Sequence, residues 1–149
     1  MHVFVTGGTG HSGSYIVPEP IAAGHEVTAM ARSDTAAAAL SALGAKVRRC
    51  DLQDLEGLKE TAADSDGVIH VAHRQDLLPS GGMYAVAAAE LPIMQAYGEA
   101  LAGTAKPLVV MGSIGSPGNL GRPATEEDPA PPAISTRKPC GRATSWRPP

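Results

Sequence analysis

Apolar residues occur along the chain in short runs, and five of these runs are continuous rather than alternating with polar residues. Continuous apolar runs are typical of strands that are buried on both faces of a parallel sheet. The runs predict strands over residues 2–6, 26–31, 45–50, 66–73 and 107–113.

Between these strands, apolar residues recur at helical spacing, which predicts helices over residues 12–23, 34–44, 52–64 and 83–103. Gly24 and Gly44 stand where helices commonly end in glycine, and Asp34 is expected to be an N-cap. Pro92 is expected to bend the last helix. Alternating strands and helices with short connections predict an α/β fold, with crossover helices on both faces of a parallel sheet.

Two prolines, Pro18 and Pro20, fall inside the first predicted helix. Each removes a backbone hydrogen bond and clashes with the preceding turn, at roughly 3 kcal/mol or more inside a helix. We expect this helix to be strongly destabilised, or alternatively to kink and end near Val17.

Composition narrows the class of protein. The 149 residues are 43% hydrophobic but only 3% aromatic, so we expect one globular domain with an aliphatic core. A net charge of −3 argues against general binding to nucleic acid or to anionic membranes. No signal peptide and no run of about 20 apolar residues is apparent, so a cytoplasmic protein is expected. Cys50 and Cys140 lack metal-ligand spacing, which indicates two free thiols and no metal site.

The character of the chain changes near residue 115, where proline becomes frequent and apolar periodicity ends. Residues 1–128 carry 8 basic and 15 acidic side chains, whereas residues 129–149 carry 4 basic and no acidic ones. We expect a surface loop over residues 115–134 and an irregular or disordered segment after it.

The glycine-rich segment "TGGTGHSG", residues 6–13, follows the first strand directly and opens a helix. Gly7 would allow a sharp turn, Gly10 a close backbone approach to a pyrophosphate, and Gly13 close packing of the helix. His11 and Ser12 lie in the same loop, which the first helix N–H groups would complete as a phosphate cradle. The alternatives are a tight turn without a ligand and, for Ser12, simple helix capping.

The loop resembles the T-G-x-x-G-x-x-G motif of the short-chain dehydrogenase/reductase superfamily, in its extended and atypical, NAD-dependent epimerase/dehydratase branch. Four later segments, "CDLQD", "DGVIHVAH", "VVMGSIG" and "PATEEDPAPP", resemble further parts of that family in the same order. The resemblance implies a doubly wound Rossmann sheet of five strands in the order 3-2-1-4-5. It also implies a dinucleotide-binding domain over residues 1–132, with an incomplete C-terminal part and an irregular tail over residues 133–149.

The resemblance also implies site residues. Asp51 and Leu52 would flank the adenine, and Ala72 and His73 would lie along the ribose of the cofactor. The alternative for His73 is an ordinary loop histidine, and His70, in the middle of the strand, is expected to be a buried packing residue. Ser113 would orient a substrate carbonyl or hydroxyl as a catalytic residue, with a strand-end cap as the alternative.

The end of the second strand bears on the choice of cofactor. Arg32 and Ser33 stand where an acidic residue would bind the ribose 2′-hydroxyl of NAD, so NADP is favoured and NAD remains possible. Asp34 falls one or two positions too late for that role. The alternative for Arg32 is a solvated surface charge.

One element of the family is missing, the Tyr-x-x-x-Lys pair that moves a proton during hydride transfer. Tyr15, Tyr84 and Tyr97 are not followed by lysine four positions later. The segment after "DPAPP", "AISTRKPCGRATSWRPP", resembles an out-of-frame read of a GC-rich gene, which favours a truncated or frame-shifted product.

The resemblance therefore implies an NAD(P)-binding domain whose parent activity is oxidoreductase or nucleotide-sugar epimerase/dehydratase chemistry. The alternatives are a non-catalytic NADP-binding or redox-sensing module, and a vestigial product. The expected partners are the dinucleotide and an unidentified small-molecule substrate; the sequence predicts no oligomeric state.

Overall fold

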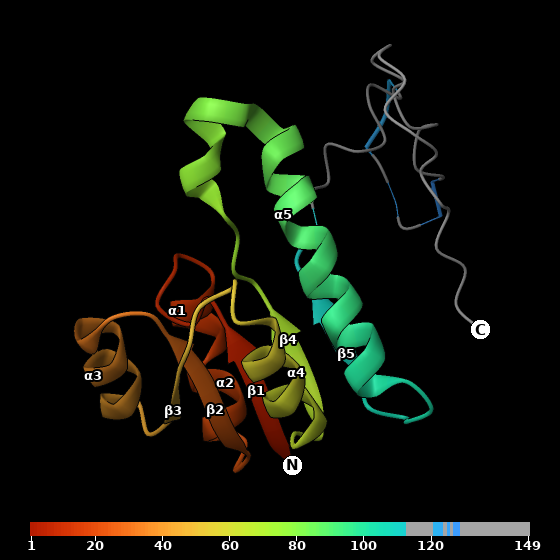
Figure 1. The fold of residues 1–149 in the computed structure, drawn as a ribbon. Helices are drawn as coiled ribbons and strands as arrows, with labels where there is room; N and C mark the ends of the chain where they lie inside the picture. Colours follow the sequence, from red (N-terminus) through yellow and green to blue (C-terminus); the bar gives the residue numbers. More distant parts are fainter. Residues whose placement is uncertain (113–120, 124, 126, 129–149) are drawn as a thin grey trace. The chain divides into compact units, whose positions relative to one another are not determined.

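Five parallel strands form one sheet in the order β3-β2-β1-β4-β5, as Figure 1 shows. This structure is a computed structural model, and it describes residues 1–112, 121–123, 125 and 127–128. The chain divides into two units, Met1–Met111 and Gly112–Pro149, and the whole sheet lies in the first. The predicted α/β fold and strand order are confirmed. The strands are β1 (His2–Thr6), β2 (Glu26–Ala31), β3 (Lys46–Arg49), β4 (Gly67–His70) and β5 (Leu108–Val110).

The last three strands are shorter than predicted, because the register of the sheet ends them together. Thr6 pairs with His70, and His70 pairs with Val110. After Thr6 the chain turns away at Gly7, so residues beyond His70 have no strand to pair with. Residues 71–73 leave the sheet for this reason, and Ser113 lies outside the described residues.

The first predicted helix is interrupted near Val17, which is where the alternative expected it to end. It consists of α1 (Gly13–Ile16) and α2 (Pro18–Ala22), which meet at Val17. Val17 keeps a helical backbone, with φ −61° and ψ −41°, so the break lies in the hydrogen bonds and not in the course of the chain. Gly24, at φ +79°, ends α2 as expected: its N–H donates to the Ile21 carbonyl and the next N–H to Pro20.

Two later helices begin differently from the prediction, one at another cap and one at a later residue. Ser33, not Asp34, caps α3 (Asp34–Ala42), and its hydroxyl oxygen accepts from the Ala36 N–H at 3.1 Å. Asp54 caps α4 (Leu55–Ala63), so this helix begins three residues later than predicted. In both cases the side chain whose oxygen reaches the third N–H fixes the start of the helix.

The long helix α5 (Leu78–Leu101) follows a short 3-10 turn, η1 (Gln75–Leu77). Its backbone is non-helical at Gly82, with φ 60° and ψ −163°. Figure 1 shows that the first part of α5 runs in a different direction from the rest of the helix. Pro92, where the sequence predicts a bend, keeps a helical backbone. Glycine tolerates the positive φ that breaks the helix, so the break falls at Gly82.

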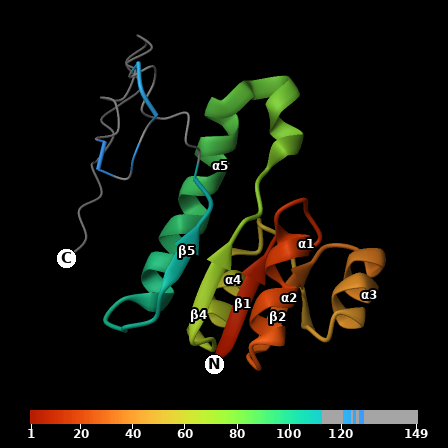
Figure 2. The same cartoon turned by 180° about the vertical axis from the view of Figure 1, so that it is seen from behind.

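Two hydrophobic clusters lie on the two faces of the sheet. One joins Phe4, Leu58 and Ile93 under α4 and α5, and the other joins Val5 and Leu40 under α1, α2 and α3. Figures 1 and 2 show these two helix layers from opposite sides. The core is mainly aliphatic, as expected, but it also contains two fully buried aromatic side chains, Phe4 and Tyr97.

Among the helices in the described part of the chain, none combines the length and the apolar character needed to cross a lipid bilayer.

Candidate functional site

A pocket of about 840 Å³ opens at the carboxyl ends of the strands. Each of the five strands is followed by at least one residue of its wall. The connections from β1 and β4 run to opposite faces of the sheet, toward α1 and α5 respectively. In open parallel sheets, ligands bind at such a reversal point. The wall consists of Gly7, Thr9, Gly10, His11, Ser12, Gly13, Met30, Arg32, Ser33, Ala36, Asp51, Leu52, Val71, Ala72, His73, Gln75, Asp76 and Met111.

All the cofactor-binding residues predicted from the sequence border this one pocket: Gly7, Gly10, His11, Ser12, Gly13, Arg32, Ser33, Asp51, Leu52, Ala72 and His73. Their roles in binding remain predictions. The predicted catalytic residue, Ser113, lies outside the described residues. The wall also contains seven residues that the sequence analysis does not name as site residues: Thr9, Met30, Ala36, Val71, Gln75, Asp76 and Met111. The last three follow the ends of β4 and β5, and that position is the signal that could have found them.

Two glycines shape the first loop. Gly7 has φ +74°, and a Cβ there would lie 2.7 Å from the Ala72 backbone nitrogen. A Cβ on Gly13 would overlap the Gly7 carbonyl. Gly13 therefore allows the start of α1 to pack against the loop itself. The Gly10 N–H donates to the Gly7 carbonyl at 2.9 Å and closes the turn.

The loop offers polar groups to the pocket. Within the described part of the chain, the backbone N–H groups of His11 and Ser12 donate to no protein acceptor. Ser12 precedes α1 but makes no capping bond, so the capping alternative does not hold; its hydroxyl donates to the Met111 sulfur at 3.9 Å. Free N–H groups at the first turn of a helix suit an anion such as a diphosphate.

A positive charge lies where β2 ends. The Arg32 side chain is exposed, borders the pocket, and forms no ion pair within the described residues. The Ser33 hydroxyl oxygen accepts from the Ala36 N–H, which leaves its own O–H free to donate. Asp34 is not in the wall; it is fully exposed and pairs with Arg49 at 3.1 Å. The carboxylate of Asp34, which is close to Arg32 in the sequence, thus lies outside the pocket.

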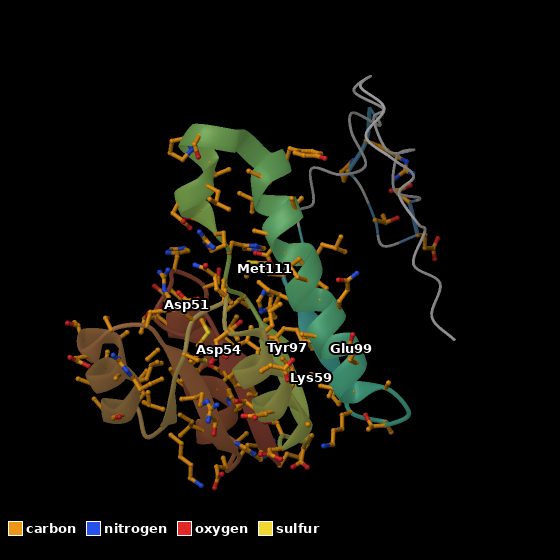
Figure 3. All side chains as sticks on the ribbon, in the orientation of Figure 1. Asp51, Asp54, Lys59, Tyr97, Glu99 and Met111 are labelled. Carbon is orange, nitrogen blue, oxygen red and sulfur yellow. The ribbon has the colours of Figure 1, made fainter. Side chains whose placement is uncertain are left out.

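Both carboxylates in the pocket wall already have partners. Asp51 accepts from the Gln53 N–H at 2.6 Å, and Figure 3 shows this residue beyond the end of β3. Asp76 accepts three hydrogen bonds from Arg74, at 2.8, 2.9 and 3.2 Å, which hold the pKa of this carboxyl below its usual range. Leu52 is buried and connects the wall to the core.

Polar side chains also follow β4. His70 is fully buried, which agrees with its interpretation as a packing residue, and its Nδ1 lies 2.8 Å from the Thr6 hydroxyl. Burial lowers the pKa of His70, against the opposing effect of its hydrogen bond to Glu90. His73 is a wall residue, and its Nδ1 lies 3.3 Å from the same Glu90.

None of the chain's tyrosines borders the pocket in the described structure. Tyr97 is fully buried, its hydroxyl lies 3.3 Å from His70 Nδ1, and burial raises its pKa. This is the opposite of the lowered pKa that a tyrosine needs for proton transfer at neutral pH. Tyr15 and Tyr84 are 73% and 78% exposed.

Cys50 does not belong to the pocket wall in the described part of the chain. Cys50 is a free, half-buried thiol whose pKa is raised by burial, and Cys140 lies outside the described residues. Within the described ranges, no group of three or more His, Cys, Asp or Glu side chains could hold a metal ion.

Known proteins resemble this chain in sequence and fold. An uncharacterized protein of Schizosaccharomyces pombe is 40% identical over 136 residues, which cover 89% of this chain and 44% of that protein. The sterol-4-alpha-carboxylate 3-dehydrogenase (decarboxylating) of Dictyostelium discoideum is 44% identical over 71 residues, 48% of this chain and 22% of that enzyme.

Among solved structures, a UDP-glucose-4-epimerase from Stenotrophomonas maltophila with bound NAD superposes with a TM-score of 0.70 at 23% identity. The match covers 87% of this chain and 42% of the epimerase, and it supports the fold alone. The chain thus spans less than half the length of each of these relatives.

A family model supplies the widest match, over residues 3–144, which includes the sheet and the glycine loop. By that match, the chain belongs to the NAD-dependent epimerase/dehydratase family.

Proposed function

We propose that this chain is the dinucleotide-binding part of an NAD(P)-dependent oxidoreductase or nucleotide-sugar epimerase/dehydratase, and that it prefers NADP. The observation that carries the preference is the charge at the end of β2. Arg32 borders the pocket without an ion pair in the described structure, whereas Asp34 pairs with Arg49 outside it. An unpaired guanidinium suits the 2′-phosphate of NADP, and NAD would need a carboxylate there.

A dinucleotide would lie along the pocket, with its diphosphate at the glycine loop. At Gly7 and Gly13 a Cβ would clash with the neighbouring backbone, so the glycines allow the loop its tight turns. The free N–H groups of His11 and Ser12 suit the diphosphate. On one side, Arg32 and Ser33 would hold the phosphorylated ribose, with Asp51 and Leu52 beside the adenine.

On the other side, Ala72 and His73 would lie along the second ribose. The bound nicotinamide would supply or accept the hydride. Ser113 would orient the substrate, and residues 1–132 would form the binding domain; both remain proposals.

The test is a titration of the folded protein with NADPH and NADH. NADPH should bind more tightly by roughly tenfold or more, since a hydrogen bond to a charged group contributes about 1.5–3 kcal/mol. Arg32→Asp should reverse the order, because a carboxylate repels the 2′-phosphate and accepts from a 2′-hydroxyl.

Lys46→Ala is the matched control, because Lys46 is a cation of the neighbouring strand β3, lies outside the pocket wall, and pairs with Glu26 rather than with Asp34. Its preference for NADPH should match that of the unsubstituted chain. Equal affinities for the two cofactors, or an unchanged order in Arg32→Asp, would overturn the assignment.

A second candidate is a non-catalytic NADP-binding or redox-sensing module. The observation that favours it is the placement of the tyrosines, since Tyr97 is buried with a raised pKa and none borders the described pocket. Assays of NADPH oxidation with a panel of carbonyl compounds distinguish the candidates, because a module of this kind binds NADPH without consuming it.

A further inference from the structure

Glu90 of α5 joins two histidines that differ in exposure. Its Oε2 lies 3.1 Å from Nε2 of His70, whose side chain is fully buried, and its Oε1 lies 3.3 Å from Nδ1 of His73, whose side chain is 32% exposed. The Glu90 side chain itself is only 16% exposed. Both carboxylate oxygens therefore contact ring nitrogens, one on a buried ring and the other on a partly exposed ring.

The hydrogen bonds of His70 fix the position of its proton. A carboxylate can only accept, so Nε2 of His70 carries the hydrogen that Glu90 receives. In the neutral ring, Nδ1 is then an acceptor, and it faces two hydroxyl donors, Thr6 at 2.8 Å and Tyr97 at 3.3 Å. The lowered pKa of His70 agrees with a neutral ring.

The same reasoning gives His73 the opposite tautomer. Its Nδ1–H donates to Glu90, so in the neutral ring Nε2 carries the lone pair. Within the described residues, that nitrogen has no protein partner, and His73 belongs to the pocket wall. The wall therefore presents a hydrogen-bond acceptor at the end of β4.

A hydrogen-bond acceptor at this position determines which chemical group of a ligand can bind there. A lone pair binds hydroxyl donors and repels phosphate oxygens, which are acceptors themselves. The strand order places β2, with Arg32 after it, and β4, with His73 after it, on opposite sides of β1 and its glycine loop. A dinucleotide whose phosphorylated ribose lies at Arg32 would bring its other ribose to His73.

We propose that Glu90 is a positioning residue, which holds His73 in the tautomer whose Nε2 accepts a hydrogen bond from a hydroxyl of the nicotinamide-side ribose. The inference rests on the proposed function for the identity of the ligand. The contact between Glu90 and the two histidines does not depend on it.

The first test measures the tautomers directly, by the ring ¹⁵N chemical shifts of the ligand-free protein. His73 should be protonated at Nδ1 and His70 at Nε2. In Glu90→Gln only one acceptor oxygen remains for two ring N–H groups, so the excess of the Nδ1–H form of His73 should decrease. A His73 ring protonated at Nε2 in the unsubstituted chain would overturn the proposal.

The second test compares two ligands, NADPH and adenosine-2′,5′-bisphosphate, which lacks the nicotinamide riboside. Glu90→Gln should weaken NADPH binding by roughly three- to tenfold, as expected for one hydrogen bond, and leave the bisphosphate unaffected. His73→Ala, an exposed substitution that should not impair folding, should give the same pattern. Equal losses for both ligands, or none for NADPH, would contradict the positioning role.

Glu99→Gln is the matched control, because Glu99 lies on the same helix and pairs with Lys59 at 2.7 Å, between α4 and α5 (Figure 3). It should leave both affinities and both tautomers unchanged. If the unsubstituted chain binds neither ligand, the proposed function fails, and the ring nitrogen shifts still decide whether Glu90 positions His73.

Discussion

Gly13 illustrates how one atom can decide the shape of the binding loop. The Gly7 carbonyl occupies the position that a Cβ on Gly13 would take, so α1 starts in direct contact with the turn at Gly7. Gly10 is different, because its nearest obstacle is that same oxygen at 3.2 Å and the residue is exposed. The sequence predicts a packing role for Gly13 and a ligand-approach role for Gly10; the position of the missing Cβ of Gly13 agrees with the first, and the second remains a prediction.

Gly13→Ala should therefore destabilise the fold as well as weaken dinucleotide binding. Overpacking of this kind costs about 1–3 kcal/mol, measured as the free energy of unfolding in urea. Gly98→Ala is the control, because Gly98 lies in α5 with nothing near its missing Cβ. That change should stabilise the chain by roughly 0.5–1 kcal/mol, as alanine does in helices. An unfolding midpoint unchanged by Gly13→Ala would mean that the loop relaxes freely.

At the scale of elements, the first helix shows how a sequence conflict is resolved. Pro18 is the first residue of α2, where the missing N–H is not needed and the fixed φ suits the helix. Pro20 lies two residues further on, and its own carbonyl accepts from His25 in the turn that ends the helix. Val17, between α1 and α2, is fully buried against the core. The break thus keeps the Val17 side chain in the core, while the helix lacks the two backbone hydrogen bonds that Pro18 and Pro20 cannot donate.

Replacing the prolines by leucine should stabilise the unit, because the helical backbone at Val17 would let both new N–H groups bond. Pro20→Leu should add up to about 3 kcal/mol, and Pro18→Leu less, since proline is tolerated at the first helical position. Urea unfolding of both single variants and the double variant gives the values. Three unchanged midpoints would show that the interruption is part of the fold's design.

Much of the element order could be predicted, because buried parallel strands are short apolar runs and glycine marks helix ends. The exact ends of the strands could not be predicted, since they depend on pairing partners in other strands. His70 ends β4 because Thr6 ends β1, 64 residues earlier in the chain. Glu90 was missed for the same reason: nothing local links a glutamate in the long helix to histidines 17 and 20 residues before it.

At the scale of the whole molecule, a buried polar cluster joins two strands of the sheet to the helix that packs on it. Thr6 comes from β1, His70 from β4, and Glu90 and Tyr97 from α5, which Figure 3 shows beside the sheet. Buried polar groups stabilise a fold only while every member keeps its partner. A proton added to His70 would remove the lone pair to which Thr6 and Tyr97 donate, so the cluster links global stability to pH.

The sign of that link follows from the lowered pKa of His70, which burial causes. In the unfolded chain this histidine takes up a proton near its ordinary pKa of about 6.5, whereas the folded ring takes it up only at lower pH. The stabilisation is therefore complete above about pH 6.5 and decreases as the pH falls toward the folded-state value. The contribution of this one group can change by at most about 1.4 kcal/mol per pH unit.

Unfolding free energies measured from pH 8 down to pH 5 test this expectation. His70→Gln should be less stable at pH 8, because one buried ring and its contacts are lost, but its stability should fall less steeply between pH 6.5 and 5. The difference between the two curves isolates one histidine, since the carboxylates and the other four histidines are common to both chains. Parallel curves would mean that His70 takes up its proton equally in the folded and unfolded states, and that the buried cluster tolerates the charge.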